Sequence, residues 1–419
     1  MFPHAPSSTA RRFVALTLLV GALVQAPLSA RETPATPTSA ASTGDAALVE
    51  ALDTAFAATY PADSPGASVL VRRGDTVLLK RGYGSASLEL DVPLAPESVF
   101  RIGSVTKQFT AVGILMLIED GKLRLDQTLA EALPDYPGEH ATQVTIEHLL
   151  THTSGIPSYT DDADFWPNAR DDHSHDEMFA YFADDALQFD PGSAWKYNNS
   201  GYYLLGAIIE TASGTSYGDF LRQRIFRPLG MSSTFVDEPG RLIRHRVQGY
   251  QPDPTSGFRT AEPISMTCPG AAGAMVSTVE DLDRWNRALD GETLVPRKWL
   301  DRAWTPYRLS TGEATDYGYG WLVGTHHGVD GRAHRVIEHG GGIHGFTTHA
   351  LRLPDDQIFV TVLSNGHPSP PNRATRIAAS LVLGEDPDPA PVDVAPAVLD
   401  RYVGVYRSED GTERAVTVD

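Results

Sequence analysis

Cysteine and positive charge are both scarce in this sequence. The single cysteine among 419 residues, Cys268, excludes an internal disulfide and any zinc or iron–sulfur site built from several thiolates. The 34 Lys and Arg are outnumbered by 53 Asp and Glu, which gives a formal net charge of −19. A surface of that sign repels phosphate backbones, so we expect no nucleic acid partner. Hydrophobic residues make up 41% and charged residues 21%, which is globular composition and excludes disordered, collagen-like and coiled-coil chains.

The apolar run near the N-terminus is too short to cross a membrane. Phe13–Val24 has 12 residues, whereas a spanning helix needs about 20. Arg11 and Arg12 precede the run, and Leu28-Ser29-Ala30 resembles a cleavage site. We therefore predict a signal peptide at residues 1–30, an exported protein in the periplasm or outside the cell, and no stable membrane span once the signal is removed. An uncleaved N-terminal anchor is the alternative.

Patterns along the rest of the chain predict one sheet made from both of its ends, with a helical insert between them. Residues 31–44 are rich in Thr, Ala, Pro and Ser and predict a flexible linker. Apolar residues at helical spacing and strand-like runs follow. The predicted helices are 45–59, 105–119, 145–151, 202–212, 217–226, 278–289 and 373–383. The predicted strands are 67–71, 76–83, 320–323, 335–338, 346–353 and 358–363.

Three segments do not fit this main domain of residues 45–385. Residues 160–176 are acidic, contain histidines and show no periodicity, so we expect an exposed excursion. Residues 386–398 are rich in Pro and Asp and predict a second linker. Residues 399–419 predict two strands without a partner sheet, and such a hairpin alone is marginal in water.

The first pattern that carries chemistry is Ser104-Val105-Thr106-Lys107, at the start of the apolar helix 105–119. Residues three apart share one face of a helix, so Lys107 lies beside Ser104. Burial lowers the pKa of a lysine, which can then take the proton of a serine hydroxyl and make it a nucleophile. Taken alone, the tetrapeptide also fits a helix cap with a solvated lysine.

Two further patterns complete a possible site. Tyr197-Asn198-Asn199 offers a phenol that can shuttle protons and an amide that can hold a carbonyl or a lysine, although alone it fits a turn. His339 is followed by three glycines directly after a predicted strand. Gly341 and Gly342 would let a ligand approach the strand edge and would offer N–H groups to an oxyanion, although a bulge or turn explains them equally.

In this order, S-x-x-K, Y-x-N and H-x-G resemble the serine β-lactamase and penicillin-binding protein superfamily. The closer resemblance is to its class C β-lactamase-like branch, with D-Ala-D-Ala carboxypeptidases, D-aminopeptidases and family VIII esterases. It extends over about residues 46–385. Flanking segments also look like the family: Phe100–Gly103, His148–Gly155, Ala272–Thr278, Tyr317–Trp321 and Gly345-Phe346.

The resemblance implies a fold and a set of roles. The fold class would be α/β (α+β), with an antiparallel sheet flanked by helices plus an all-helical subdomain, as in β-lactamases and transpeptidases. Ser104 would be the acylated nucleophile, and Lys107 and Tyr197 would share the role of general base. Asn199 would bind the substrate amide, and the N–H groups of Ser104 and Gly342 would form the oxyanion hole. No metal or organic cofactor is implied.

This sequence departs from class C enzymes at one position. His339 stands where they carry the lysine of K-T-G, which puts β-lactamase activity in doubt. A histidine near Lys107 should be mostly neutral at pH 7, so we expect weaker selection for substrates that bear a carboxylate. The tail from residue 399 looks like the start of an extra C-terminal β-domain found in some relatives, here cut short.

We therefore predict an exported serine hydrolase that forms an acyl-enzyme with an ester, amide or lactam of a small molecule or short peptide. The alternatives are a D-Ala-D-Ala carboxypeptidase or D-aminopeptidase, and a penicillin-recognising sensor that is acylated without turnover. His148 and His152 have the spacing of a zinc-binding helix, but Leu149 stands where a zinc protease carries its glutamate. The sequence predicts neither the substrate nor the oligomeric state.

Overall fold

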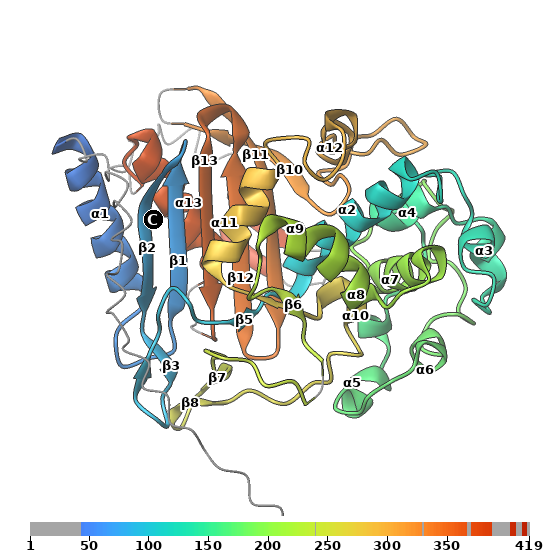
Figure 1. The fold of residues 1–419 in the computed structure, drawn as a ribbon, viewed down its shortest axis with the longest axis horizontal. Coiled ribbons are helices and arrows are strands. Elements are labelled where there is room, and N and C mark those ends of the chain that lie inside the picture. The colour runs from blue at the N-terminus through green and yellow to red at the C-terminus, as the bar shows by residue number, and fades with distance from the viewer. Residues whose placement is uncertain are drawn as a thin grey trace, which may run out of the picture. The chain divides into compact units, whose positions relative to one another are not determined.

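A six-stranded antiparallel sheet organises the chain and is built from both of its ends (Figure 1). The computed structural model describes residues 43–238, 240–328, 331–366, 370–387, 403–407 and 413–416. The strand order is β10-β11-β12-β13-β1-β2, so the N-terminal hairpin pairs through β1 with the C-terminal strand β13. The strands are β1 (Ala67–Arg73), β2 (Thr76–Tyr83), β10 (Leu322–His327), β11 (Ala333–Ile343), β12 (Phe346–Leu353) and β13 (Ile358–Ser364). The predicted fold class, including the sheet from both chain ends, is confirmed.

Helices cover both faces of this sheet because its central strands are apolar on both sides. Val69 and Val71 of β1 pack with α1 (Thr43–Thr59) and α13 (Pro371–Leu383), whereas Leu70 faces the opposite core. That second core includes Leu282 of α11 (Val279–Ala288), which crosses the front of the sheet in Figure 1. The result is a three-layer arrangement of helix, sheet and helix.

The helical insert lies beyond the β10–β11 side of the sheet (Figure 1). Its central helix α2 (Thr106–Glu119) has twelve buried residues and packs against α7 (Asn199–Ser213). The other short helices of the chain are α3 (Leu129–Ala132), α4 (Ile146–Leu150), α5 (Phe165–Asn168), α6 (His175–Phe179), α8 (Tyr217–Leu221), α9 (Arg227–Leu229), α10 (Gly270–Gly273) and α12 (Arg297–Ala303). The minor sheets contain β3 (Ser85–Ser87), β4 (Val92–Pro93), β5 (Phe100–Arg101), β6 (Phe235–Val236), β7 (Tyr250–Asp253), β8 (Gly257–Thr260) and β9 (Met275–Ser277). 

Several boundaries differ from the sequence prediction. The strand expected to end at Glu338 continues as β11 to Ile343, so the glycine run is part of the sheet and not a turn. The strand expected at 320–323 is β10 at Leu322–His327, and α12 was not predicted. Residues 160–176 include the helix α5, and its Phe165 is 1% exposed, so this segment is not merely an exposed excursion.

Polar contacts attach α1 to the edge of the sheet. Arg73 at the end of β1 pairs with Asp45 at 2.5 Å, and Arg81 of β2 pairs with Asp53 at 2.9 Å.

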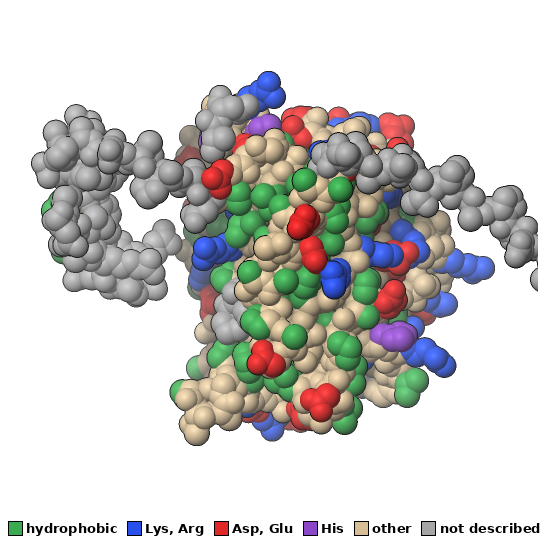
Figure 2. Space-filling model, turned by 90° about the vertical axis from the view of Figure 1, so that its left-hand side faces the viewer, with side chains coloured by type: hydrophobic (Ala, Val, Ile, Leu, Met, Phe, Trp, Pro, Cys, Tyr) green, Lys and Arg blue, Asp and Glu red, His purple; other side chains and the backbone are tan. Residues whose placement is uncertain are grey.

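On the face that Figure 2 shows, acidic and apolar side chains are interspersed. No helix among the described residues is both long and apolar enough to cross a membrane.

The predicted signal peptide and nearly all of the first linker lie outside the described residues, as do residues 388–402 of the second linker and tail. In the predicted tail, β14 (Gly404–Arg407) and β15 (Glu413–Val416) pair antiparallel as a two-stranded sheet. The domain boundaries remain predictions.

Candidate active site

Ser104 lies in a single 3-10 turn, η1 (Gly103–Val105), between β5 and the first turn of α2. Gly103 has φ +50°, and a Cβ there would lie 2.8 Å from the backbone nitrogen of Gly342, so glycine is required for this close approach. The carbonyl of Ile102 accepts a hydrogen bond from Thr348 Oγ1 of β12 at 2.8 Å. These contacts fix the position of Ser104 against the sheet.

Lys107 is fully buried one turn after Ser104, as its spacing predicted. Its Nζ lies 3.1 Å from Ser104 Oγ, 2.9 Å from Asn199 Oδ1 and 2.8 Å from the carbonyl oxygen of Ala272. A protonated amine donates to all three oxygens. A neutral amine donates to the amide and the carbonyl and can accept the Ser104 proton on its lone pair. The proton can therefore move from serine to lysine without breaking any of these contacts.

Burial sets the protonation of the two proposed proton-transfer groups. Desolvation lowers the pKa of Lys107 well below its ordinary value, which favours the neutral amine. Burial also raises the pKa of Tyr197, and the hydrogen bond with Ser104 offsets only part of this rise. The phenol is thus protonated at neutral pH. The Nζ of Lys107 lies 4.9 Å from the centroid of the Tyr197 ring.

The loop that carries Tyr197 ends at the start of α7. Asn198 caps this helix by accepting the N–H of Gly201 at 2.6 Å, and Asn199 is its first residue. Asn199 Oδ1 accepts from Lys107, so the amide predicted to hold a carbonyl or a lysine contacts the lysine. Its Nδ2 lies 3.4 Å from Thr160 Oγ1.

His152 supports this loop and was not predicted as a site residue. It is 1% exposed and has φ +60°, which is rare for a histidine. Its Nδ1 accepts the N–H of Asn198 at 3.1 Å, and its ring lies 4.5 Å from the Tyr197 ring. The segment His148–Gly155 was noted for its resemblance to the family, but nothing in its spacing shows a contact with residue 198.

A zinc site at His148 and His152 would require one helix that carries both histidines. In the structure α4 ends at Leu150, two residues before His152. The Nδ1 of His148 accepts from the N–H of Thr145 in a capping box, and His152 accepts from Asn198. Among the described residues, no group of three or more His, Cys, Asp or Glu is placed to hold a metal ion.

The sheet side of the site is formed by the glycine strand, which is the part of β11 that contains Gly340, Gly341 and Gly342. Ile343 and Phe346 close the β11–β12 hairpin as a pair, and pairing then alternates along the ladder. Gly341 therefore bonds to β12, whereas the N–H of Gly342 points to the open edge beside Gly103. A Cβ on Gly341 would lie 2.0 Å from the carbonyl oxygen of Ile102, so only glycine lets the strand approach η1 this closely.

His339 does not line the cavity beside Ser104, and its ring centroid lies 6.2 Å from that of Tyr197. It is 3% exposed; its Nδ1 lies 2.5 Å from the carbonyl of Gly340 and its Nε2 2.9 Å from Tyr317 Oη. The carbonyl can only accept, so Nδ1 carries the proton and Nε2 accepts from the phenol. Burial, followed by the charge of Lys107, lowers the pKa of His339 to about 3. The ring is neutral at pH 7. Tyr317 belongs to a segment noted for its resemblance to the family, but its contact with His339 was not predicted.

A small cavity of about 90 Å³ opens beside Ser104. The segment 160–176 supplies part of its wall, including Trp166, whose ring stacks on His344 with centroids 5.5 Å apart. Of the described residues that line it, none is Asp, Glu, Lys or Arg. They are Ser104, Tyr159, Thr160, Phe165, Trp166, Asn199, Ile264, Pro269, Ala272, Gly273, Gly342, Ile343 and His344.

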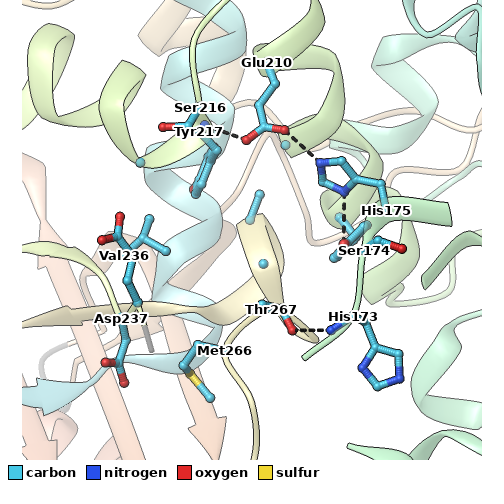
Figure 3. A pocket seen from close by; sticks show the side chains of 16 residues that line it. His173, Ser174, His175, Glu210, Ser216, Tyr217, Val236, Asp237, Met266 and Thr267 are labelled. Atoms are coloured by element: carbon cyan, nitrogen blue, oxygen red, sulfur yellow. Dashed lines mark hydrogen bonds and ion pairs between the residues drawn. The ribbon is translucent and has the colours of Figure 1, made fainter. Parts of the chain in front are cut away.

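A second cavity, of about 480 Å³, is lined by Gly270 and Ala271 of α10 (Figure 3), whereas Ala272 and Gly273 of the same helix line the first cavity. Figure 3 shows His175 and Glu210 pointing toward one another at the edge of the second cavity, with His175 Nε2 2.7 Å from Glu210 Oε2. His175 Nδ1 lies 3.0 Å from Tyr203 Oη, and Glu210 also accepts the N–H of Tyr217 at 2.7 Å. These polar groups satisfy one another. The cavity matters to the site because Ala271 of α10 lines it, next to the carbonyl that holds Lys107.

Comparisons with known proteins agree with this geometry. A family described as Beta-lactamase matches residues 52–384. Penicillin-binding protein 4* of Bacillus subtilis (strain 168) is 32% identical over 378 residues, covering 84% of this chain and 81% of that protein. A D-aminopeptidase of Gluconobacter oxydans (strain 621H) is 29% identical over 348 residues, which is 80% of this chain and 61% of the relative. The crystal structure of D-amino acid amidase from Ochrobactrum anthropi SV3, complexed with L-phenylalanine amide, superposes with a TM-score of 0.67 at 26% identity, covering 82% and 98% of the two chains.

Proposed function

Because the chain belongs to the beta-lactamase family of serine hydrolases, we propose that it hydrolyses small, uncharged esters and amides through an acyl-enzyme on Ser104. The observation that supports this most is the contact between Lys107 Nζ and Ser104 Oγ at 3.1 Å, with the lysine fully buried. A neutral lysine beside a serine at a helix start is the arrangement that nucleophilic catalysis needs.

In the first step, Lys107 takes the proton of Ser104 Oγ as the oxygen attacks the substrate carbonyl carbon. The negative charge that develops on the carbonyl oxygen is stabilised by the N–H groups of Ser104 and Gly342. Tyr197 gives its phenolic proton to the leaving group and regains one from the Lys107 ammonium. The bond from carbon to the leaving group breaks, and an acyl-enzyme remains with both proton-transfer groups in their starting forms.

In the second step, a water molecule replaces the leaving group. Its proton passes to the same Lys107–Tyr197 pair as its oxygen attacks the ester carbon of the acyl-enzyme. The bond to Ser104 Oγ then breaks, the serine regains its proton, and the free acid leaves. Asn199 holds the lysine in place through both steps because its Oδ1 accepts from Nζ at 2.9 Å.

The chemistry of the cavity supports neutral substrates. Charged groups on a bound substrate need a partner of opposite charge when they leave water. The described lining of the cavity contains no Asp, Glu, Lys or Arg, and the buried His339 is neutral. Phe165 and Ile343 instead offer apolar walls close to Ser104. A compact apolar acyl group therefore fits better than a group that carries a carboxylate.

A second candidate, an amide of a D-amino acid, is favoured by one contact outside the cavity. Asp161 directly follows the lining residue Thr160, and its half-exposed carboxylate pairs with Lys196 at 3.0 Å. Lys196 directly precedes Tyr197. Each member of the Asp161–Lys196 ion pair is therefore the sequence neighbour of a residue at the site. A substrate ammonium could replace Lys196 at this carboxylate. The D-aminopeptidase and D-amino acid amidase relatives are consistent with such a substrate.

Export is part of the same proposal and rests on residues 1–30 alone. The basic pair at Arg11 and Arg12 and the apolar run that follows it support a signal peptide. Expression in a bacterial host, followed by fractionation and N-terminal sequencing, should find the chain outside the cytoplasm and beginning at Arg31. An intact N-terminus on a cytoplasmic product would contradict export.

Substrate comparison and covalent labelling test the enzymatic proposal. We expect kcat/KM to be highest for short p-nitrophenyl acyl esters, lower for D-phenylalanine amide, and lowest for a chromogenic cephalosporin or a D-Ala-D-Ala peptide. A fluorophosphonate probe should label Ser104, and Ser104→Ala should lose both labelling and turnover. Preference for D-phenylalanine amide that Asp161→Asn abolishes would establish the second candidate instead. An acyl adduct that forms without turnover would indicate a sensor.

A further inference from the structure

A cavity of about 490 Å³ lies at the end of the sheet away from Ser104. Ile343 and Phe346 mark the site end of β11 and β12, whereas this cavity adjoins the opposite end of β12 at Arg352 and the end of β1 at Arg72. The chain around α11 and α12 supplies Asp290 and Trp304. None of these residues takes part in the proposed acyl transfer.

Two buried side chains at this cavity keep donors without a protein partner. Arg352 is 5% exposed, and only its Nη2 has a partner among the described residues, the carboxylate of Asp290. Its Nε and Nη1 donate no hydrogen bond to a described residue, and neither does Nε1 of Trp304, which is 1% exposed. Buried N–H groups are almost always satisfied, so several together at one cavity indicate that something else accepts from them.

The guanidinium of Arg352 is held in a defined position. Its Cζ lies 4.6 Å from the Trp304 ring centroid, so the cation rests on an aromatic face. The Cζ of Arg297 also lies near this ring, 5.4 Å from its centroid. Burial lowers the pKa of Arg352 to about 10, which still leaves it cationic at neutral pH. The unmatched donors therefore belong to a fixed, charged group.

The charged residues that line the cavity are balanced, with Arg72, Arg297 and Arg352 against Asp75, Asp290 and Asp355. Arg72 is buried as well and pairs with buried Asp283 at 2.6 Å, and it also lies 4.0 Å from Asp290. Asp290 is half exposed and is shared between the two arginines. The buried groups alone, Arg72, Arg352 and Asp283, carry one positive charge in excess. The other charged residues of the lining, Asp75, Asp355 and Arg297, are exposed to solvent.

The cavity shown in Figure 3 makes a useful contrast. There the side chains of His175, Glu210 and Tyr203 form hydrogen bonds with one another, so these three groups need no ligand as a partner. At Arg352 the donors have no such partner.

We propose that Arg352 and Trp304 form a binding site for an oxyanion group, a carboxylate, sulfate or phosphate, carried by a small ligand. The site is separate from the hydrolytic site and does not depend on the proposed function.

Anion binding to the full chain tests the proposal. Inorganic phosphate, sulfate and acetate are titrated separately, with sodium chloride at matched ionic strength, and binding is followed by thermal unfolding and calorimetry. We expect a saturable rise in the melting temperature with at least one oxyanion and none with chloride. The anion that binds most tightly shows which of the three oxyanion groups the site prefers. A rise that follows ionic strength alone, or no binding of any of the three, would overturn the proposal.

Three variants locate the binding. Arg352→Lys keeps the charge but loses the guanidinium donors and should weaken the Kd at least tenfold. Trp304→Phe keeps an aromatic face and removes Nε1, so a loss of a few-fold is expected with ester hydrolysis unchanged. The control Arg259→Gln removes an exposed arginine elsewhere and should bind as the wild type does. Equal binding by all four proteins refutes the site. If Arg352→Lys does not fold, selenate must be located beside Arg352 by anomalous scattering, and its absence there also refutes it.

Discussion

The contact between the glycine strand and η1 leads to a sharp prediction for Gly341→Ala. A Cβ at this position would lie 2.0 Å from the carbonyl oxygen of Ile102 and 2.4 Å from Thr348 Oγ1, whereas real Cβ atoms essentially never come within 3.0 Å of another heavy atom. The strand and the turn must therefore separate by about 1 Å. Ser104 is two residues from that carbonyl, so it moves relative to the N–H of Gly342. A misplacement of about 1 Å typically costs a factor of about 100 in rate.

We expect kcat/KM for a p-nitrophenyl ester, and the rate of fluorophosphonate labelling, to fall about 100-fold in Gly341→Ala. That corresponds to about 2.7 kcal/mol of transition-state stabilisation. The matched control is Gly340→Ala, because a Cβ there meets its nearest neighbour at an ordinary 3.6 Å and the residue does not line the cavity. The control should remain within about threefold of the wild type. Active-site titration and melting curves correct both rates for the folded fraction. If folded Gly341→Ala is labelled as fast as the control, the strand contact does not position Ser104.

Three further predictions follow from the same geometry. Lys107→Met and Tyr197→Phe should each remove most of the labelling rate and their double variant little more, because the two groups pass one proton; strictly additive losses would contradict this. Gly206→Ala should slow labelling about tenfold, since its Cβ would lie 2.5 Å from Ala271 Cβ and would displace α10 beneath the lysine; an unchanged rate would refute that link. Burial lowers the pKa of His349 to about 3, so between that pH and about 6.5 the unfolded chain binds a proton that the native protein does not. Stability therefore falls as the pH drops through this window. Between pH 7 and pH 5, the free energy of unfolding measured in urea should fall by about 2 kcal/mol more in the wild type than in His349→Gln; equal losses would contradict the assignment.

The parts of the fold that the sequence predicted correctly are those with strong local patterns. Alternation and apolar runs marked the strands from 67 to 83 and from 346 to 363, and helical spacing marked α1, α2 and α13. The strand β11 was cut short because three glycines normally signal a turn. Here they remain in the ladder because the neighbouring turn η1 leaves no room for a side chain at Gly341. Such a reason is tertiary and cannot be read from local sequence.

The candidate site shows the same division. The neighbourhood of Ser104 and Lys107 follows from helical spacing, which is a local property. The contact of Asn199 with Lys107 joins residues 92 positions apart. The chemistry of the amide allowed a carbonyl or a lysine as its partner, and the family resemblance implied the substrate amide, so the sequence did not predict which of them it contacts. His152 was missed as a support for Tyr197 because its role depends on a left-handed backbone and on a hydrogen bond across 46 positions. Neither feature has a signature in the sequence.

The place of His339 changes how the pH dependence of this enzyme should be read. From the sequence, a histidine at the position where class C enzymes carry the lysine of K-T-G could sense substrate carboxylates near pH 7. In the structure both ring nitrogens are engaged within the protein, and burial lowers the pKa of His339 to about 3. It therefore stays neutral from pH 6 to pH 8 and cannot change the preference between an acid and its ester in that range. Any titration of kcat/KM at neutral pH must come from another group. We expect Lys107 to be involved, because its Nζ lies 3.1 Å from the reacting oxygen and burial lowers its pKa. Since Tyr197 shares its proton, the apparent value belongs to the pair, and replacing His339 by glutamine should leave that titration where it is.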